Sequence, residues 1–429
     1  MDENWADRLD CRYRNAKGRY RLHIAIFLDQ NPGTLGGAQA SVVLQKKYLE
    51  LAGHRVTICA PHGDFPPAPG VLTYPSLPLT LNREFAFTLQ ASRAIRHLNR
   101  KFASIADTID IVHVQADNWG AAIGVRFARE HNLPLVNTLH TNLEYAVQKI
   151  LGKRIGQLSV LALSTGFALV SKVPGLKSTK SAWRYLRQIS KSSQMVFAPS
   201  LHFAQLAMNH GVATKIHPLS NGVDDKFATI ELPAKPKKTA KDAPKVSLLW
   251  CGRVSDEKRI MPFLKAVDLA AVDCDVRVYG TGSQLAEAEA FVAKQGLSDR
   301  VKFLGRVSHN DMLLEMKEVD VLVQTSVGFE TQGMTVYEAG VMGTPSVICD
   351  HNIAADLPDN SYWLVEDESV AALAKAIKTA VWDVKAGNPK HIDLRSQMLQ
   401  SKLSERTLEL YRQAIKLHAA GQKDTDRLS

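Results

Sequence analysis

Short apolar runs rich in β-branched residues alternate along the chain with longer stretches whose apolar residues recur every three or four positions. The runs of the first half cover residues 22–28, 55–60, 110–115, 135–139 and 195–198. The same rhythm restarts later with residues 246–251, 276–280, 301–304, 319–324 and 346–349. Strands that alternate with helices predict parallel sheets built from crossover units. The predicted fold class is therefore α/β, with two successive doubly wound sheets.

The chain has 429 residues, which is more than one hydrophobic core usually organises, so we expect two domains. A segment rich in Pro, Lys and Ala at residues 232–245 predicts a surface insertion near the domain boundary. The expected parts are an N-terminal extension at 1–20, a first domain at 21–215, a second domain at 216–395, a helix at 399–417 that packs back on the first domain, and a polar tail at 418–429.

Cysteine usage and the N-terminal residues indicate the cellular compartment. The five cysteines form no CxxC pair and show no metal-ligand spacing, which is typical of a reduced cytoplasmic chain. The first 20 residues mix acids and bases without an apolar core, unlike a secretory signal. The most apolar stretch, residues 158–170, is shorter than the roughly 20 residues of a membrane span. We therefore expect a cytoplasmic protein without a transmembrane segment.

The net charge of +10 predicts an anionic partner, and its distribution narrows the choice. Nine bases and no Asp or Glu lie between Lys149 and Lys191. Four of them, Lys177, Lys180, Arg184 and Arg187, accompany Trp183 and Tyr185 after an apolar run. This pattern predicts a basic face that docks on an anionic membrane, at about 1 kcal/mol for each base near the surface. A solvated basic face over a buried apolar helix is the alternative.

Glycines follow the first predicted strand and precede the first predicted helix. Gly33, Gly36 and Gly37 would let a substrate approach the backbone closely, although a tight turn would need the same residues. Their spacing does not fit GxGxxG, and Gly280 and Gly282 lack the third glycine of that motif. A nicotinamide or flavin site is therefore not expected.

Two later segments carry charged side chains on loops that lead into helices. In CGRVSDEKR, Arg253 and Lys258 stand near a helix start, where two cations suit a diphosphate, or belong to a solvated loop. In residues 321–347, a strand leads to Glu330, and Glu338 lies inside the following helix. Free amides at the helix start can bind phosphate, and the two carboxylates can accept bonds from hydroxyls. Acids favoured by the helix dipole are the alternative.

Together these motifs resemble family 4 of the retaining glycosyltransferases, over roughly residues 21–417. The resemblance rests on the E-x7-E spacing from Glu330 to Glu338 with AGVMGTPSV after it, on GRVSDEKR, on FLGRVSHNDM, and on APS with SNGVD. It implies the GT-B fold, in which two Rossmann-like domains face a central cleft. It also implies transfer of a sugar from a nucleotide diphosphate donor without a metal or cofactor.

The resemblance further implies a role for each motif residue. Glu330 would hold hydroxyls of the donor sugar, and Glu338 would bind the ribose hydroxyls. Arg253 and Lys258 would neutralise the departing diphosphate. The remaining predicted contacts are the amides of Gln332, Gly333, Met334 and Thr335 with the donor, and Gly36, Gly37 and His140 near the point of transfer.

One feature departs from the family pattern, and another has the form of a metal-binding motif. The family often has a histidine pair where this chain reads VHVQ, with His113 and Gln115, which affects the expected acceptor contacts. Asp273 and Asp275 form a DxD that leads a strand of the second half, and we interpret it as structural rather than metal-binding.

The ETQGMT variant of the signature resembles enzymes that glycosylate diacylglycerol, with UDP-glucose or a related hexose as donor. A lipid acceptor at the inner face of the cell membrane is thus the first choice. The alternatives are GDP-mannose-dependent mannosylation of phosphatidylinositol or another glycolipid, a soluble or polysaccharide acceptor, and a sugar-nucleotide epimerase. A nucleic-acid-binding protein would fit the charge but would leave the Glu, Arg and Gly motifs unexplained.

Overall fold

The computed structural model divides the chain into two compact units. The first runs to Gly222 and resumes at Gln400, and the second is Val223–Leu399. The structure describes residues 21–428, except Leu35 and residues 64–65, 67, 79–85, 88–90, 104–108 and 231–244. The predicted extension at 1–20 and nearly all of the predicted insertion at 232–245 lie outside the described residues. The first unit ends a few residues later than the expected boundary at 215.

The first unit is built on a parallel sheet with the order β3-β2-β1-β6-β7-β8-β9. Strand β1 lies inside this sheet and pairs in parallel with β2 on one side and with β6 on the other. The described strands are β1 (His23–Leu28), β2 (Arg55–Pro61), β3 (Val71–Tyr74), β6 (Ile111–Gln115), β7 (Leu135–Thr138), β8 (Met195–Ala198) and β9 (His217–Pro218), with a separate hairpin of β4 (Leu77–Pro78) and β5 (Ala86–Phe87).

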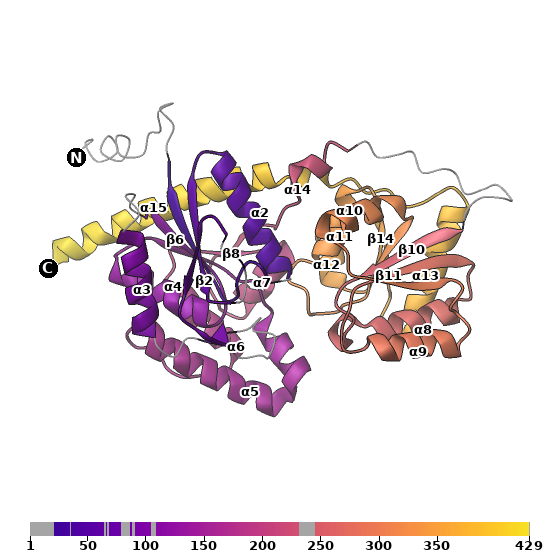
Figure 1. Cartoon of the computed structure of the whole chain (residues 1–429), viewed down its shortest axis with the longest axis horizontal. Helices are drawn as coiled ribbons and strands as arrows, with labels where there is room; N and C mark the ends of the chain where they lie inside the picture. Colours follow the sequence, from indigo (N-terminus) through magenta and orange to yellow (C-terminus); the bar gives the residue numbers. More distant parts are fainter. Residues whose placement is uncertain are drawn as a thin grey trace. The chain divides into compact units, whose positions relative to one another are not determined.

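Helices cover both faces of this sheet (Figure 1). One face packs against α3 (Ala91–Ala103), α4 (Trp119–Glu130), α5 (Leu143–Ser171), α6 (Ala182–Ser190) and α7 (Leu201–Asn209). The other face packs against α2 (Gly37–Leu51) and the C-terminal helix α15 (Gln400–Leu428). Burial on both faces explains why the strands read as continuous apolar runs rather than alternating ones.

Helix α15 belongs to the first unit although the chain passes through the second unit before it. Tyr411 is fully buried, and its hydroxyl lies 2.6 Å from Nδ1 of His113 on β6. The helix runs on to Leu428, so the expected polar tail at 418–429 is largely helical. Residues 418–428 contain no proline and several good helix formers, so their polarity does not end the helix.

The second unit repeats the architecture with the parallel order β12-β11-β10-β13-β14-β15. Its strands are β10 (Val246–Cys251), β11 (Cys274–Tyr279), β12 (Val301–Gly305), β13 (Val321–Gln324), β14 (Ser346–Ile348) and β15 (Tyr362–Leu364). Its helices are η1 (Asp225–Phe227), η2 (Asp256–Lys258), α8 (Ile260–Ala270), α9 (Leu285–Lys294), α10 (His309–Glu318), α11 (Met334–Val341), α12 (His351–Ala355), α13 (Val370–Lys385) and α14 (Arg395–Met398). Two buried clusters line its two faces.

Each sheet has one point where the strand order reverses, between β1 and β6 in the first unit and between β10 and β13 in the second. Ligands of doubly wound sheets bind outside the carboxyl ends of the strands at such points. The loops after β1 and β6, and those after β10 and β13, are therefore the places to look for functional side chains.

Helix α5 is longer and more apolar than the sequence pattern indicated. Residues Leu151–Ser171 form a 21-residue stretch with a mean hydropathy of 1.3, which is long and apolar enough by length and composition to cross a membrane. The apolar stretch is thus longer than the expected residues 158–170, because glycine and charged residues before residue 158 interrupt its pattern in the sequence, and the backbone at Gly152 is not helical. That no segment crosses a membrane stays a prediction. A third of the stretch is buried, with Val160 and Phe167 in the core. The core helix of a soluble protein can have the same length and apolar composition.

Candidate active site

In the second unit, the loops after β10 and β13 meet at the reversal point and are tied together. The Thr325 hydroxyl donates to the backbone oxygen of Lys258 over 2.6 Å and accepts from Nε1 of Trp250 over 2.9 Å. Trp250 lies on β10 and is 2% exposed, so the anchor is part of the core. The predicted residues Arg253, Lys258 and Glu330 are consequently held on neighbouring loops.

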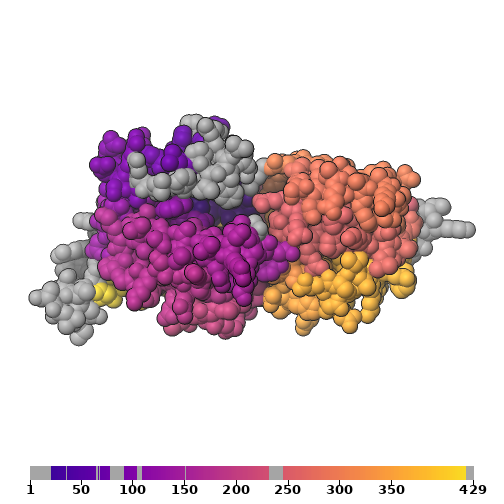
Figure 2. Space-filling model, turned by 90° about the horizontal axis from the view of Figure 1, so that it is seen from below, coloured from indigo at the N-terminus to yellow at the C-terminus, as the bar shows by residue number. Residues whose placement is uncertain are grey.

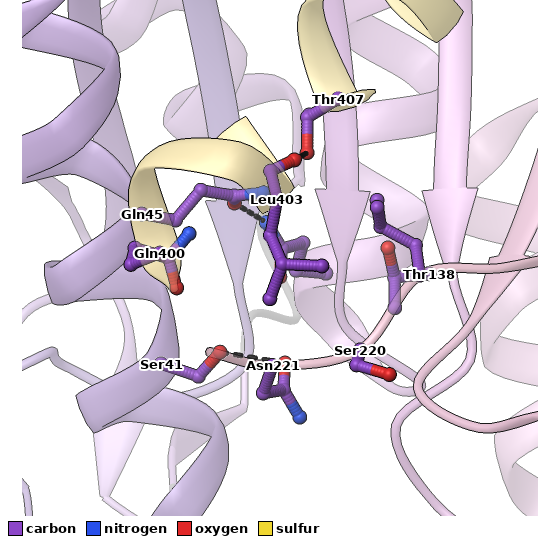
Figure 3. A pocket seen from close by; sticks show the side chains of 10 residues that line it. Ser41, Gln45, Thr138, Ser220, Asn221, Gln400, Leu403 and Thr407 are labelled. Atoms are coloured by element: carbon purple, nitrogen blue, oxygen red, sulfur yellow. Dashed lines mark hydrogen bonds between the residues drawn. The ribbon is translucent and has the colours of Figure 1, made fainter. Parts of the chain in front are cut away.

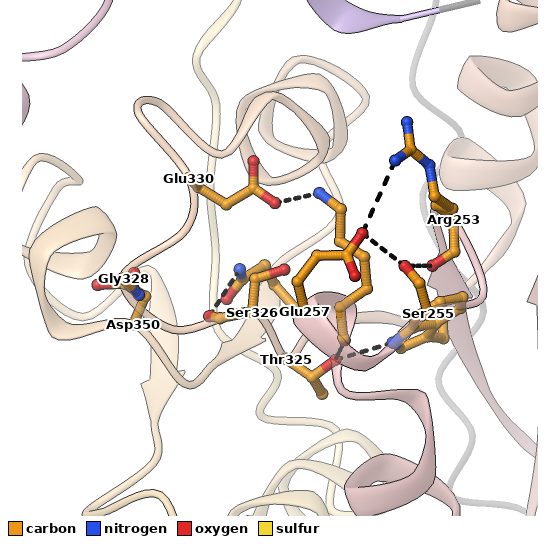
Figure 4. A network of polar contacts seen from close by, with 11 residues as sticks. Arg253, Ser255, Glu257, Thr325, Ser326, Gly328, Glu330 and Asp350 are labelled. Atoms are coloured by element: carbon orange, nitrogen blue, oxygen red, sulfur yellow. Dashed lines mark hydrogen bonds and ion pairs between the residues drawn. The ribbon is translucent and has the colours of Figure 1, made fainter. Parts of the chain in front are cut away.

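The structure brings two of the predicted catalytic side chains into direct contact. Nζ of Lys258 forms an ion pair with Glu330 and lies 5.2 Å from the centroid of the Phe329 ring. The Lys258 and Glu330 side chains are 24% and 20% exposed, so a ligand can reach both. Figure 4 shows Glu330 on one side of this network and Arg253 on the other. The Arg253 side chain is 67% exposed and lies 3.9 Å from Glu257.

The glycines of VYGTG support this loop instead of forming a dinucleotide motif. A Cβ on Gly280 would lie 1.8 Å from the backbone oxygen of Gly252, and one on Gly282 would lie 2.2 Å from that of Val254. The two loops also exchange backbone bonds, including Gly252 to Tyr279 at 3.0 Å. Only glycine permits this approach, which holds the Arg253 and Lys258 loop against the sheet.

Helix α11 begins at a backbone position that requires glycine. Gly333 precedes it with a φ of +80°, and a Cβ there would also lie 2.7 Å from Ile353. No side chain caps this helix, and Gln332 before it is buried while Met334 and Thr335 are partly open. The first amides of α11 therefore lie beside Glu330 without a capping side chain, as a bound diphosphate would require.

Glu338, the predicted ribose residue, has a partner to which the sequence analysis gave no role. His309 Nε2 lies 2.7 Å from Glu338 Oε1. The Glu338 side chain is 9% exposed and that of His309 is 50% exposed. The signal in the sequence was only the presence of His309 within FLGRVSHNDM, because nothing in that motif shows that it reaches the next helix.

In the first unit, His140 lies after β7 in a chain of polar side chains. Its Nε2 is 2.9 Å from Gln115 Oε1, and the Gln115 amide donates to Gln45 of α2 over 2.6 Å. Burial lowers the pKa of His140 to about 4 and that of His113 to about 3, so both rings are neutral at neutral pH. Gln115 thus links β6 to His140.

Gly36 and Gly37 begin helix α2 close to the carboxyl edge of the first sheet. Gly36 has an extended backbone, and no side chain caps the helix. A Cβ on Gly37 would meet nothing within 4 Å. The space beside Gly37 is open, which suits the predicted approach of a substrate to this backbone.

Sequence reasoning did not find Asp29 and Asp117, which lie after β1 and β6 at the reversal point of the first sheet. Asp29 accepts bonds from the backbone N–H groups of Asp117, Asn118 and Gly120, at 2.7, 2.9 and 2.9 Å. It thereby holds the start of α4. Burial raises the pKa of Asp29, and burial together with the neighbouring Asp29 raises the pKa of Asp117 to about 7. One Asp117 oxygen is buried without a hydrogen-bond partner.

A polar pocket lies where the chain leaves the first unit and returns to it (Figure 3). Ser41 of α2 bonds to Asn221 over 2.6 Å, and Gln400 of α15 accepts from the backbone of Gly222 over 3.2 Å. Figure 3 shows Gln45, Thr138 and Thr407 around the same space. Helix α2, which starts at Gly37, is thus bonded directly to the exit segment of this unit.

The buried histidines of the first unit predict sensitivity to acid. His54, His113 and His140 all have lowered pKa values in the folded state, with burial as the largest cause. Their protonation therefore favours the unfolded chain, and stability is lost as the pH falls below 6.5 towards 4. In this range each histidine lowers the free energy of unfolding by about 1.4 kcal/mol for each pH unit of acidification. Asp117, whose pKa is raised, acts in the opposite direction and offsets the effect of about one histidine.

Hydrogen exchange of peptides from β6 and α15 between pH 4.5 and 7 would measure this loss, after correction for the intrinsic exchange rate. The variant His113→Gln should remove about 1.4 kcal/mol per pH unit from the slope. Equal stability of the first unit at pH 5 and pH 7 in the wild-type protein would contradict the prediction.

Asp273 of the DxD pairs with Lys245 at 2.9 Å, which agrees with a structural reading of that motif. Within the part of the chain that the structure describes, no three His, Cys, Asp or Glu side chains are placed to hold a metal ion. That transfer proceeds without a metal stays a prediction.

The four predicted docking bases are exposed on α6 and the segment before it. Lys177 and Lys180 precede the helix, and Arg184 and Arg187 lie on its outer side. The buried side of α6 carries Tyr185, Leu186 and Ile189. The helix is therefore amphipathic, with its basic side in solvent.

Comparisons with known proteins agree with this architecture. The family model for Glycosyltransferase Family 4 matches residues 35–227, and the model for Glycosyl transferases group 1 matches residues 233–389. An alpha-monoglucosyldiacylglycerol synthase of Streptococcus pneumoniae is 24% identical over 83% of this chain and 78% of its own length. A protein of the same name from Acholeplasma laidlawii is 23% identical over 76% of this chain and 80% of its own length.

Solved structures show the same fold at low identity. Anabaena HepE in complex with UDP has a TM-score of 0.60 and 16% identity, over 95% of this chain and 99% of its own. Sucrose-phosphate synthase of Thermosynechococcus elongatus has a TM-score of 0.64 and 17% identity, over 95% of this chain and 100% of its own. The two family domains, the two parallel sheets and the loops at their reversal points lead to one conclusion: the chain is a glycosyltransferase of family 4 with the GT-B fold.

Proposed function

We propose that this enzyme transfers a hexose, with retention of configuration, from UDP-glucose or a related nucleotide diphosphate sugar to a lipid acceptor such as diacylglycerol. The observation that carries the donor half is the Lys258–Glu330 pair beside the uncapped start of α11. A cation, a carboxylate and a helix start without a side-chain cap, within one loop cluster, match a diphosphate joined to a hydroxylated sugar. HepE, with the same fold, binds UDP, which favours uridine as the base.

In the proposed reaction, the bond between the anomeric carbon and the diphosphate oxygen breaks while the acceptor oxygen attacks from the same face. The acceptor proton passes to the departing diphosphate, so no protein nucleophile is needed. Lys258, Arg253 and the first amides of α11 stabilise the charge that develops on the leaving group. Electrostatic preorganisation of this kind is commonly the largest part of the rate enhancement.

The acceptor half of the proposal rests on the surface of α5 and α6. Ile155, Leu158 and Leu169 are 61%, 57% and 74% exposed. At about 100° per residue they share one face of α5, opposite the buried Val160 and Phe167. In Figure 2, residues of α5 and α6, in magenta tones, form a broad part of the first unit's surface.

Bases surround this apolar stripe without any acid between them in the sequence. All nine bases from Lys149 to Lys191 are exposed. Apolar side chains in the acyl boundary and bases at the headgroups are typical of peripheral membrane proteins. The names of the S. pneumoniae and A. laidlawii relatives support a diacylglycerol lipid as the acceptor.

Radiolabelled UDP-glucose and GDP-mannose, each supplied with diacylglycerol vesicles, phosphatidylinositol vesicles or a soluble oligosaccharide, would test the proposal. We expect label in the organic phase only with UDP-glucose and diacylglycerol, as an α-linked product. Label on the oligosaccharide would favour a soluble acceptor, and label on phosphatidylinositol from GDP-mannose would favour a mannosyltransferase. Conversion of the sugar nucleotide without any acceptor would favour an epimerase.

The docking surface can be tested apart from catalysis. Changing Lys177, Lys180, Arg184 and Arg187 together to Ser should reduce binding to anionic vesicles and transfer to lipid, because about 1 kcal/mol is lost for each base at the surface. Sedimentation with vesicles of increasing anionic content, at low and high salt, measures the effect. Affinity for UDP should not change, since the donor residues lie in the other unit.

A variant that changes four exposed bases elsewhere, Lys265, Lys294, Lys302 and Lys385 in the second unit, is the matched control and should bind vesicles like the wild type. Unchanged vesicle binding by the first variant would reject this surface. If the wild-type protein ignores anionic vesicles, a soluble acceptor becomes the better proposal.

A further inference from the structure

The contact between His309 and Glu338 joins a nearly buried carboxylate to a side chain that is open to solvent. Nε2 of His309 lies 2.7 Å from Oε1 of Glu338, and the two side chains are 50% and 9% exposed. Glu338 is the residue that, by the family resemblance, would bind the ribose of the proposed donor. His309 therefore lies at the solvent side of the carboxylate that the nucleoside has to reach.

The position of His309 is fixed by local structure. It is the first residue of α10, and the Ser308 hydroxyl caps that helix by accepting from the backbone of Asp311 over 3.2 Å. Glu338 lies within α11, which packs against α10 in the same hydrophobic cluster. Two ordered helices thus set the distance between the ring and the carboxylate.

Charged groups from two elements surround the ring. The hydrogen bond that the His309 ring donates to Glu338 raises the pKa of His309 most, and burial opposes it. Asp224, which precedes η1, also raises the pKa, and Lys226 of η1 lowers it. The net effect is upward, so the ring is protonated over a wider pH range than a free histidine and donates to Glu338 there.

A carboxylate can accept this bond and still bind a diol. Each carboxylate oxygen has two lone pairs, so one bond from His309 leaves capacity on both oxygens of Glu338. A hydrogen bond between charged groups also restricts the rotation of the carboxylate. The carboxylate is then oriented before the ligand arrives, which lowers the entropic cost of binding.

We propose that His309 is a positioning residue of the nucleoside site: it holds Glu338 in the orientation in which the carboxylate accepts the two hydroxyl groups of a ribose. The inference rests on the proposed function and extends it, since it assigns a second side chain to recognition of the ribose. The ligand class is a ribonucleoside diphosphate sugar. His309 acts through Glu338 and need not contact the ligand itself.

The test uses the full chain and measures the Kd of UDP-glucose by calorimetry from pH 6 to pH 8.5. UDP-glucose is preferred to UDP because the terminal phosphate of UDP itself titrates near pH 6. The variants are His309→Ala, which removes the bond, and His309→Gln, which keeps an N–H donor without a titratable group. Asn310→Ala, at the next exposed position of the same helix, is the matched control.

We expect His309→Ala to raise the Kd about tenfold at pH 6.5, which is typical for loss of a hydrogen bond to a charged group. His309→Gln should restore most of the affinity, and Asn310→Ala should bind like the wild type. The wild-type affinity should fall as the pH rises through the pKa of His309, and both His309 variants should lack this dependence.

The 2′-deoxyribose analogue of UDP-glucose distinguishes recognition of ribose from a general structural role. Removal of this hydroxyl should weaken binding to the wild type more than binding to His309→Ala, since that variant already holds Glu338 poorly. Equal losses in both proteins, or a His309→Ala variant with wild-type affinity and an unchanged pH profile, would overturn the inference and leave the proposed function intact. A wild-type protein that does not bind UDP-glucose would overturn both.

Discussion

Replacing Lys258 with methionine is expected to lower the rate of sugar transfer by about 2 to 4 kcal/mol of transition-state stabilisation, roughly 30- to 1000-fold. The ammonium group of Lys258 is the charged donor closest to Glu330 on the loop after β10. A charge that develops on the leaving diphosphate would lose this partner. Methionine is unbranched and of similar length, so the change removes mainly the charge, together with the contact of the ammonium group with the Phe329 ring.

Turnover number and Kd for UDP, measured separately, would show where the loss falls. The rate should fall more than the affinity, because charge accumulates on the diphosphate only as the glycosidic bond breaks. Lys265→Met is the control, since Lys265 is exposed on the adjacent α8. A Lys258→Met enzyme whose turnover stays within tenfold of the wild type would contradict the leaving-group role.

The ion pair with Glu330 permits a further separation of effects. If Lys258 only kept Glu330 in place, Glu330→Gln would cost as much as the double change, because both would remove the same contact. If each residue binds its own part of the donor, the double variant should lose more than either single variant. The measured coupling therefore decides whether Lys258 and Glu330 act on the ligand or only on each other.

The sequence predicted the second unit better than the first because its chemistry is local. Arg253, Lys258, Glu330 and Glu338 lie on short segments that each follow one strand, so strand positions alone place them at one edge of a sheet. Their contacts across loops, such as the Lys258–Glu330 pair, depend on which strands are neighbours. The order β10-β13 brings these two loops together, and nothing in the spacing of the residues reveals that order.

The residues that were missed have in common that their partners are distant in the chain. Asp29 bonds to backbone groups about 90 positions later, and His309 reaches Glu338 on the following helix. An isolated Asp after a strand, or His at a helix start, has no distinctive pattern. Helix α5 was underestimated for a different reason: its backbone is not helical at Gly152, and glycine and charged residues before residue 158 interrupt the apolar pattern that continues to residue 171.

Asp29→Ala is expected to destabilise the first unit by about 3 kcal/mol, since it leaves buried backbone N–H groups without an acceptor. Asp29 accepts from the amides of Asp117, Asn118 and Gly120. Gly120 is buried so tightly that a Cβ there would lie 2.2 Å from the backbone oxygen of Leu28. Without the Asp29 carboxylate, the start of α4 would lose these three hydrogen bonds.

Because the two units can unfold separately, hydrogen exchange of peptides from each unit is the suitable measurement. Exchange should accelerate in α4 and the first sheet, while peptides of β10 and β13 should exchange as in the wild type. Asp29→Asn keeps one acceptor oxygen and should cost less than Asp29→Ala. Glu409→Ala, which removes only an exposed ion pair with Arg406 in the same unit, should change stability by less than about 1 kcal/mol.

Comparing Asp29→Ala with Asp29→Asn separates the effect of the hydrogen bonds to the start of α4 from the effect of the negative charge. Burial raises the pKa of Asp29, so the carboxylate is costly to keep ionised in the fold, and its retention needs a compensating interaction. If the three hydrogen bonds from backbone N–H groups are that interaction, Asp29→Ala should destabilise the first unit more than Asp29→Asn at every pH. If amides of the Asp29→Ala variant exchanged no faster than those of Glu409→Ala, the three hydrogen bonds would contribute nothing measurable, and the start of α4 would be held by the packing of Gly120 against Leu28 at the end of β1.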